Sequence, residues 1–330
     1  MKRGLLLIGL LLAAWPATAS AVILFSDDFD ADHTANWTVN RSHDNTAAPS
    51  DADFFFDYST VGIPSANGLG GTTRGLRMRA NRPGGSASAF SGISVSPTGG
   101  SFTGDYKITF DAWMNYQGST TNGVFDGGSG TTQALNFGLG TAGTSAQWAG
   151  AAVKDSVFFA ATFDGNSSVD YRAYSSAATS GYLAASGVFA AGTGTSPDAR
   201  NDTHSYYQGL GSKSPPAAQN ALYPSTQHGT TRPGSAGFAW RKMVVEKKGN
   251  IATWTLDNLL IATVDLNTVT LAGDNILFGV FDTNATPSAD GALADELLFG
   301  LIDNVVVTPE PASLMLLAGG ALLLRGRRRR

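Results

Sequence analysis

The chain has no cysteine among its 330 residues. This absence excludes disulfide bonds, thiol catalysis, cysteine-ligated zinc and covalent haem attachment. Stability must therefore come from burial of a hydrophobic core or from bound ions. A chain of this length can bury an ample core.

Glutamate and histidine are also scarce, with three glutamates at positions 246, 296 and 310 and four histidines at 33, 43, 204 and 228. Sandwich glucanases place two carboxylates roughly 5 to 9 Å apart, usually on a strand reading Glu-x-Asp-x-x-Glu, and no such strand occurs here. No Gly-x-Ser-x-Gly elbow accompanies the histidines either. We therefore expect a protein that is not an enzyme. The alternative is a polysaccharide-degrading enzyme, a glycoside hydrolase or lyase, whose acids are scattered.

Basic residues are few in the body of the chain. Of 22 lysines and arginines, two lie at Lys2 and Arg3 and five in the last six positions, leaving 15 against 26 acidic residues. The body thus carries a net charge near −11. Phosphate recognition needs a basic patch, so we expect no nucleic-acid partner.

Helical periodicity is nearly absent, and short alternating or apolar runs are separated by Gly, Asn, Asp and Ser. This pattern predicts antiparallel β-structure. The residues of Gly138–Gly143 match the dinucleotide fingerprint, but no helix follows them, so we reject a phosphate site. The strands we predict are 23–29, 52–58, 76–80, 87–95, 106–116, 134–139, 156–163, 169–174, 182–189, 239–247, 251–256, 259–265, 276–281 and 298–307.

The run Tyr106–Tyr116 shows the alternation of a strand in a layered sheet. Ile108 and Phe110 share one face with Ala112 and Met114, while the other face is semi-polar. One core face and one wetter face are typical of one layer of a sandwich. We predict one β-sandwich domain over residues 22–308.

The clearest local unit is Lys242–Leu266, which reads as three strands joined by two short turns. Its segment Ile251–Val264, and the closing Phe299–Val307, resemble the concanavalin A-like, laminin-G-like sandwich. The resemblance implies an all-β, antiparallel jelly-roll. Residues 190–237 break the pattern and form a loop-rich insertion, either mobile or the rim of a binding site.

Exposed aromatic side chains are the remaining candidates for ligand contact, because their flat faces suit sugar rings. Core packing is the more common role of such residues in a sandwich. The candidates for glycan contact are Trp113, Trp148, Tyr206, Tyr207 and Trp240.

Carboxylates at Asp28, Asp30 and Asp32 have the opening spacing of an EF-hand loop. The rest of that loop fails, because His33 and Val39 stand where glycine and glutamate are needed. The sandwich resemblance implies a single structural calcium ion with Asp28 or Asp30 near Asp303. The alternative is that these acids are solvated residues at strand ends.

Residues 1–21 have the pattern of a signal peptide: Lys2 and Arg3, an apolar stretch from Gly4 to Trp15, and small residues before a cut after Ala21. We therefore expect export through the inner membrane.

The tail, residues 309–330, has three parts: Pro309-Glu310-Pro311, an apolar span from Ala312 to Leu324, and an arginine-rich end. Thirteen helical residues reach about 20 Å, less than the ~30 Å of a bilayer core, so this short transmembrane helix is a poor permanent anchor. From the positive-inside rule, we expect its basic end to stay in the cytoplasm. The arginines are Arg325, Arg327, Arg328, Arg329 and Arg330.

These three parts, in this order, resemble the PEP-CTERM sorting signal of Gram-negative envelopes. The resemblance implies an exosortase as processing partner and delivery to the cell surface or extracellular matrix. A plain tail anchor is the alternative. Together the sequence predicts an exported, non-catalytic sandwich associated with exopolysaccharide, or a purely structural coat protein.

Overall fold

The structure is a computed structural model, and it describes residues 22–42, 50–80, 91–117, 133–164, 167, 169–176, 188–190, 201–283 and 296–310. The predicted signal peptide and the tail from Pro311 onward lie outside these residues. The described part contains no helix that is long and apolar enough to span a membrane.

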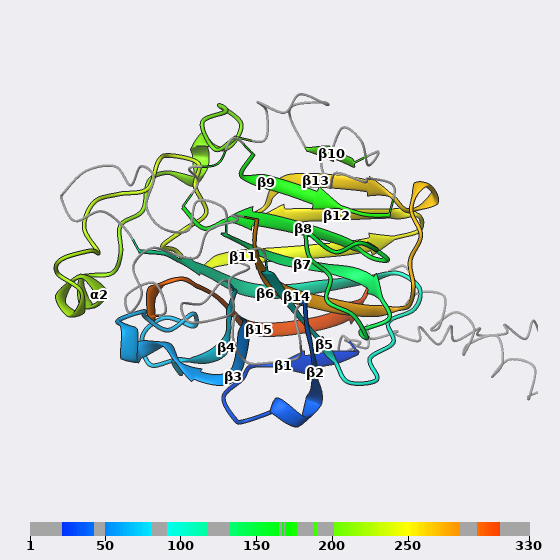
Figure 1. The fold of residues 1–330 in the computed structure, drawn as a ribbon, viewed down its shortest axis with the longest axis horizontal. Coiled ribbons are helices and arrows are strands. Elements are labelled where there is room, and N and C mark those ends of the chain that lie inside the picture. The colour runs from blue at the N-terminus through cyan, green and yellow to red at the C-terminus, as the bar shows by residue number, and fades with distance from the viewer. Residues whose placement is uncertain are drawn as a thin grey trace, which may run out of the picture.

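Two antiparallel sheets pack against each other, which confirms the predicted β-sandwich (Figure 1). The large sheet has the order β10 (Val188–Ala190), β13 (Leu259–Asp265), β12 (Ile251–Leu256), β11 (Arg241–Lys248), β6 (Tyr106–Asn115), β15 (Phe299–Pro309), β4 (Arg74–Arg79) and β3 (Asp51–Asp57). The short first strand, β1 (Phe25–Asp27), pairs with β15. The smaller sheet has the order β2 (Trp37–Arg41), β5 (Ser91–Pro97), β14 (Asn275–Asp282), β7 (Gln133–Thr141), β8 (Val157–Thr162) and β9 (Tyr171–Tyr174).

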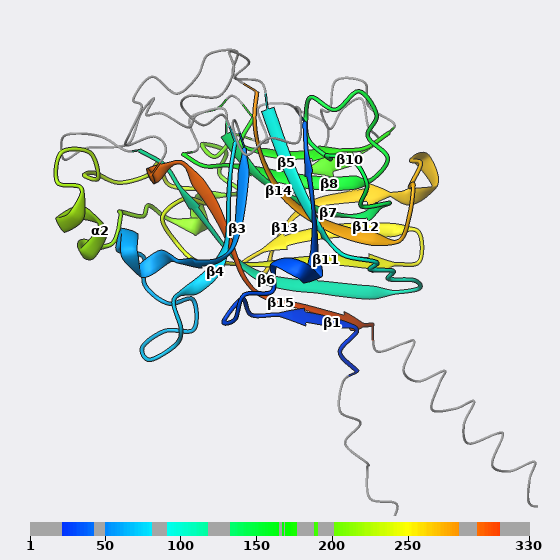
Figure 2. The same cartoon turned by 60° about the horizontal axis from the view of Figure 1, so that its bottom comes forward.

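The first and last strands of the body lie side by side, as Figure 2 shows at its lower right. Phe25 pairs with Val307, and the amide of Leu24 donates to the carbonyl of Val307 at 2.8 Å. The chain therefore enters and leaves the sandwich at the same end of the large sheet.

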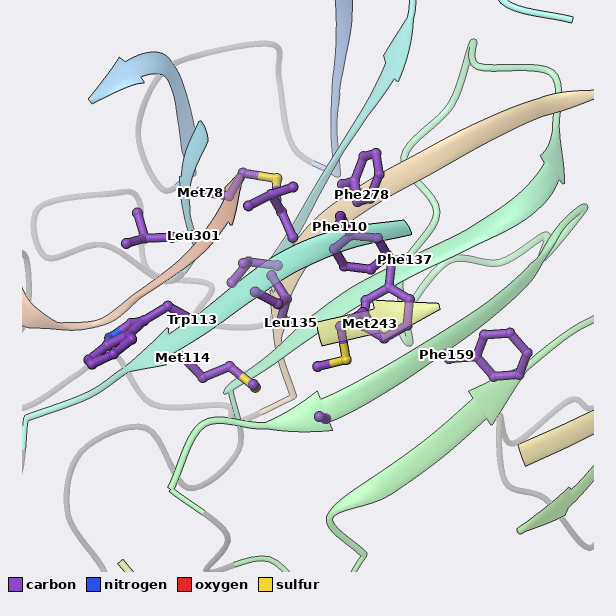
Figure 3. Close-up of a cluster of buried hydrophobic side chains, with 14 of the residues drawn as sticks. Met78, Phe110, Trp113, Met114, Leu135, Phe137, Phe159, Met243, Phe278 and Leu301 are labelled. Atoms are coloured by element: carbon purple, nitrogen blue, oxygen red, sulfur yellow. The ribbon is translucent and has the colours of Figure 1, made fainter. Parts of the chain in front are cut away.

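The core lies between the two sheets and is rich in aromatic rings (Figure 3). Phe110 meets Phe137 and Phe278 edge-on, each with a centroid distance of 5.0 Å. Trp254 packs on Phe137 at 5.1 Å. Such edge-to-face pairs add to the burial of apolar area, so the core compensates for the missing disulfides.

The outer face of the smaller sheet is covered as well. Trp148 lies against Gly92 of β5, where an added Cβ would sit 2.5 Å from the indole Cγ. Phe158 and Tyr174 stack at 4.9 Å in the same cluster. A glycine at position 92 is therefore required by the close approach of the indole.

Residues 201–237, part of the predicted insertion, pack against the end of the sandwich opposite to the start of β1 and the end of β15 (Figure 1). They include the short helices η4 (Gln208–Leu210) and α2 (Ala217–Leu222). Gln219 is buried, and its amide donates to Asn115 and to the carbonyl of Val61, both at 3.0 Å. These bonds fix the segment onto β6. Elsewhere in the described residues lie the short helices η1 (Thr34–Asn36), η2 (Tyr58–Val61) and η5 (Leu266–Thr268).

Candidate functional site

A pocket of about 480 Å³ opens between the described insertion and the meander of β11, β12 and β13. We call it the Tyr206 pocket. It combines an aromatic ring, an ion pair, a lysine and an amide side chain in one recess. Its lining residues are Tyr206, Gly209, Leu210, Lys213, Arg241, Asp257, Asn258 and Leu259.

One wall is the two-residue turn that joins β12 to β13. Asp257 and Asn258 both have positive φ, at 48° and 69°. Two such residues form the mirror-image turn that matches the twist of a hairpin, and Asp and Asn tolerate this backbone better than most residues. The exposed Asn258 side chain therefore stands at the rim on a rigid support.

Arg241 forms the floor and is only 4% exposed. Its Nη1 donates to Asp257 at 3.0 Å, and the same carboxylate accepts from the amide of Lys242 at 2.8 Å. Other guanidinium nitrogens donate to the carbonyls of Ser235 and Ala236 at 3.0 and 3.2 Å. A buried cation needs such a full set of partners, and the set ties the turn to the insertion.

Tyr206 also lines the pocket. Its hydroxyl donates to the carbonyl of Leu260 at 2.7 Å, and its ring meets the Tyr207 ring at right angles at 5.3 Å. Partial burial raises the pKa of Tyr206, so the phenol stays neutral at physiological pH. Lys213 is fixed beside it, because its backbone N–H and C=O both bond to Thr231, at 2.8 and 2.7 Å.

The pocket has the chemistry of a sugar site. A half-buried aromatic ring offers a flat apolar face, while carboxylate, amide and ammonium groups can bond to hydroxyls. Within the described residues, the pocket holds one carboxylate and no second acid or nucleophile facing it.

The other predicted glycan contacts are placed differently. Trp113, Trp148 and Tyr207 are 2%, 6% and 0% exposed, so they pack in the interior and present no open face to a sugar. Trp240 is half-buried, and its Nε1 donates to the carbonyl of Pro64 at 2.7 Å. Trp240 also packs on Tyr58 at 5.2 Å, which gives it a structural role.

Of the predicted calcium residues, Asp30 lies close enough to Asp303 for its charge to act on that carboxyl, as the resemblance implies. Asp28 and Asp30 are exposed, and the carboxylate of Asp28 accepts from the amide of Asp30 at 3.2 Å. In the part of the chain that the structure describes, no three histidine, aspartate or glutamate side chains gather in a way that could hold a metal. Asp27, which the sequence did not single out, is the buried acid of this segment and accepts from Trp37 Nε1 at 2.8 Å.

Asp303 is fully buried. Its two carboxylate oxygens accept from the Tyr58 hydroxyl at 3.1 Å and from the Asn304 amide at 2.7 Å. Burial raises the pKa of Asp303 to about 7, although these two hydrogen bonds oppose the shift.

A buried acidic cluster at the end of β8 and β9 was not predicted from the sequence. It consists of Asp164, Asp170 and Asp202, each at most 1% exposed. Asp170 accepts from the Thr162 hydroxyl at 2.7 Å and from the Asp202 amide at 2.8 Å, so it fastens the insertion to the smaller sheet.

Burial raises the pKa of Asp170 to about 6. Burial and the nearby Asp170 charge raise the pKa of Asp202 to about 8. Split pKa values of this kind also occur in catalytic pairs, but the exposure of these acids is too low for a sugar chain to reach them.

The first two residues of the predicted sorting motif, Pro309 and Glu310, lie at the end of β15. Pro309 pairs with Tyr106, and the amide of Glu310 donates to the carbonyl of Asp105 at 3.1 Å. The Glu310 carboxylate lies 3.7 Å from Lys107 Nζ. Pro311 and the five tail arginines lie outside the described residues.

No protein-family model matches the chain, and no curated protein matches it. Among solved structures, a Bacillus subtilis protein of unknown function with a galectin-like fold is 10% identical, with a TM-score of 0.43, over 87% of this chain and 96% of the other. The Emp46p carbohydrate recognition domain in its metal-free form is 8% identical, with a TM-score of 0.40, over 87% and 97%.

A Bacteroides ovatus mixed-linkage glucan GH16 protein in complex with a G4G4G3G product is 15% identical, with a TM-score of 0.39, over 86% and 100%. At identities and TM-scores this low, the function has to be argued from this chain's own residues.

Proposed function

We propose that this chain is an exported, non-catalytic β-sandwich that binds polysaccharide in the Tyr206 pocket. The observation that carries the proposal is the convergence of the Tyr206 ring, Asn258 and the Arg241–Asp257 ion pair on one recess of about 480 Å³. Each wall is fixed by hydrogen bonds before any ligand arrives. A preformed site avoids the ordering cost of binding.

The sequences at the two ends of the chain support the proposed export. Residues 1–21 direct export, and the tail, residues 309–330, holds the protein at the inner membrane until an exosortase processes it near Pro309-Glu310-Pro311. The mature body then works at the envelope surface or in the extracellular matrix. If protein recovered from the cell surface still carried Arg327–Arg330, a plain anchor would replace the sorting interpretation.

The test of the binding proposal is a set of affinity measurements between the exported protein and extracellular polysaccharides, including those of its own host. Tyr206→Ala should weaken binding about tenfold, or 1.4 kcal/mol, because the flat ring face is lost. Tyr206→Phe should bind nearly as well as the wild type, since it keeps the ring and loses only the bond to Leu260.

Tyr223→Ala is the matched control, because this half-exposed tyrosine lies outside the pocket. Equal affinities of the wild type and Tyr206→Ala for every polysaccharide would exclude the pocket. New reducing ends or unsaturated products during the same incubations would show that the protein is a glycoside hydrolase or lyase. Regular self-assembly without any glycan binding would instead indicate a structural coat protein.

A further inference from the structure

The end of the large sheet where the chain enters and leaves carries an unusual group of exposed side chains. Val22, Ile23 and Leu24 are 52%, 58% and 43% exposed, although each is aliphatic. They precede β1, and β1 pairs with the last residues of β15. Consecutive exposed aliphatic side chains form an apolar patch. Such a patch marks a contact surface more often than single exposed apolar residues do.

The neighbouring strands extend this group across the sheet. In register with Thr308 and Pro309 at the end of β15 lie Lys107 and Tyr106 on β6, and beyond them Glu246 and Lys247 on β11. Lys248 pairs with Ile251 across the following turn. Ile251 is 39% exposed. We call Val22, Ile23, Leu24, Lys107, Lys248 and Ile251 the exit surface.

The charges of this surface are nearly balanced. Lys107 pairs with Glu310, and Asp105 accepts from the amide of Gly249 at 2.8 Å. Lys247 donates to the carbonyl of Gly104 at 2.8 Å. Apolar contact must therefore supply the main attraction to any partner, with Lys248 able to extend its ammonium toward a polar layer.

The chain that follows this surface points to the occupant. The apolar span Ala312–Leu324 begins two positions after Glu310. If that span enters a bilayer, the end of β15 lies at most about 7 Å from the point of entry, because only two residues connect them. The exit surface then has to lie among the lipid headgroups, where aliphatic side chains and lysines are both well accommodated.

We propose that the exit surface is a membrane-docking face that rests on the phospholipid surface while the tail is inserted. This inference rests on the proposed membrane retention of the protein. Docking in this way fixes the orientation of the sandwich, with the exit surface toward the bilayer. It also adds a second, interfacial contact, which compensates for a transmembrane span that is short for a bilayer.

The absence of cysteine makes the test direct, because a single introduced cysteine can carry a polarity-sensitive fluorophore. The labelled variants are Ile23→Cys and Ile251→Cys on the exit surface and, as matched control, Leu222→Cys on α2. Leu222 is an aliphatic residue, 54% exposed, at the other end of the molecule. The full chain is reconstituted into phosphatidylglycerol and phosphatidylethanolamine vesicles, and emission and quenching by a headgroup spin label are measured.

The docking proposal predicts a blue shift and strong quenching at positions 23 and 251 and neither at 222. Protein that floats with the vesicles but shows a water-like emission at all three positions would overturn docking and leave membrane retention intact. Protein that does not float would overturn both. A blue shift that grows with protein density in the vesicle would assign the surface to a second copy of the chain instead.

Discussion

At the scale of single residues, the most unusual side chain is Asp202. It is fully buried, accepts no hydrogen bond on its carboxylate among the described residues, and lies near Asp170 and Asp164. Burial and those neighbouring charges favour the protonated form, which explains the pKa of about 8. The folded protein therefore keeps a proton that the unfolded chain, with an ordinary pKa of 3.8, releases.

The pH dependence of stability follows from this difference. Below pH 3.8 the folded and unfolded states both hold the proton, so Asp202 adds no pH dependence to the free energy of unfolding. As the pH rises from 3.8 toward 8, the unfolded chain binds fewer protons than the folded one, so the free energy of unfolding falls across this window. Asp170, with a pKa of about 6, also lowers the free energy of unfolding as the pH rises, over the lower part of this pH window.

We therefore expect Asp202→Asn, which does not titrate, to unfold about 5 °C above the wild type at pH 8 and to gain much less at pH 4. Thermal unfolding followed by circular dichroism across pH 4–8 measures this. Asp28→Asn, at an exposed acid, is the control and should follow the wild type. Parallel curves for Asp202→Asn and the wild type would mean that Asp202 is already ionised in the folded protein.

At the scale of elements, the hairpin of β12 and β13 determines the shape of the Tyr206 pocket. Asn258 has a φ of 69°, and a residue with a Cβ other than Asn or Asp pays about 1 kcal/mol to hold that conformation. Asn258→Ala should lower the free energy of unfolding by about this amount, while Asn258→Gly should stay within about 0.5 kcal/mol of the wild type.

Urea unfolding measures both variants. Because Asn258→Gly and Asn258→Ala both remove the side-chain amide, the difference between their free energies of unfolding reports the backbone conformation alone. Equal stability of the two variants would contradict the left-handed turn. Both should lose polysaccharide affinity to the same degree, since the Asn258 side chain lies on the pocket rim.

The same hairpin shows what sequence can predict. The bounds of β12 and β13 agree with the predicted 251–256 and 259–265, because a two-residue turn between alternating runs is a local signal. The strand β2 (Trp37–Arg41) was missed, since its five residues lie at a sheet edge and four of them are only half-buried. Edge strands lack the continuous apolar face that marks a strand in sequence.

The candidate site was harder to predict than the strands. Tyr206 and Tyr207 are adjacent, yet the first lines a pocket and the second is buried, and nothing in their sequence distinguishes them. Asp164, Asp170 and Asp202 gather only after the insertion folds back on β8 and β9. Such groups depend on contacts between distant segments, which local patterns do not encode.

At the scale of the whole molecule, the two proposed surfaces lie at opposite ends of the same strands. The Tyr206 pocket is at Arg241, the first residue of β11, and the exit surface is at Lys248, its last. Eight residues of strand span about 25 Å. In Figure 1 the insertion with α2 lies to the left, and the first residue of β1 and the last residues of β15 lie toward the right.

This arrangement predicts that membrane retention and polysaccharide binding are independent. A chain docked by its exit surface presents the Tyr206 pocket about 25 Å from the bilayer, beyond the Debye length of ~8 Å at physiological salt, so lipid charge should not alter the site. The dissociation constant for polysaccharide should therefore agree within about twofold between the full chain in vesicles and a variant that ends at Pro311, which leaves β15 complete.

Isothermal titration on both forms measures this, with Tyr206→Ala in each form to identify the pocket as the site in use. If affinity changed more than tenfold on membrane insertion, the pocket would have to lie near the lipid and the upright orientation would be wrong. An unchanged affinity, together with headgroup contact at Ile23, would describe a protein that can already hold polysaccharide before its tail is processed.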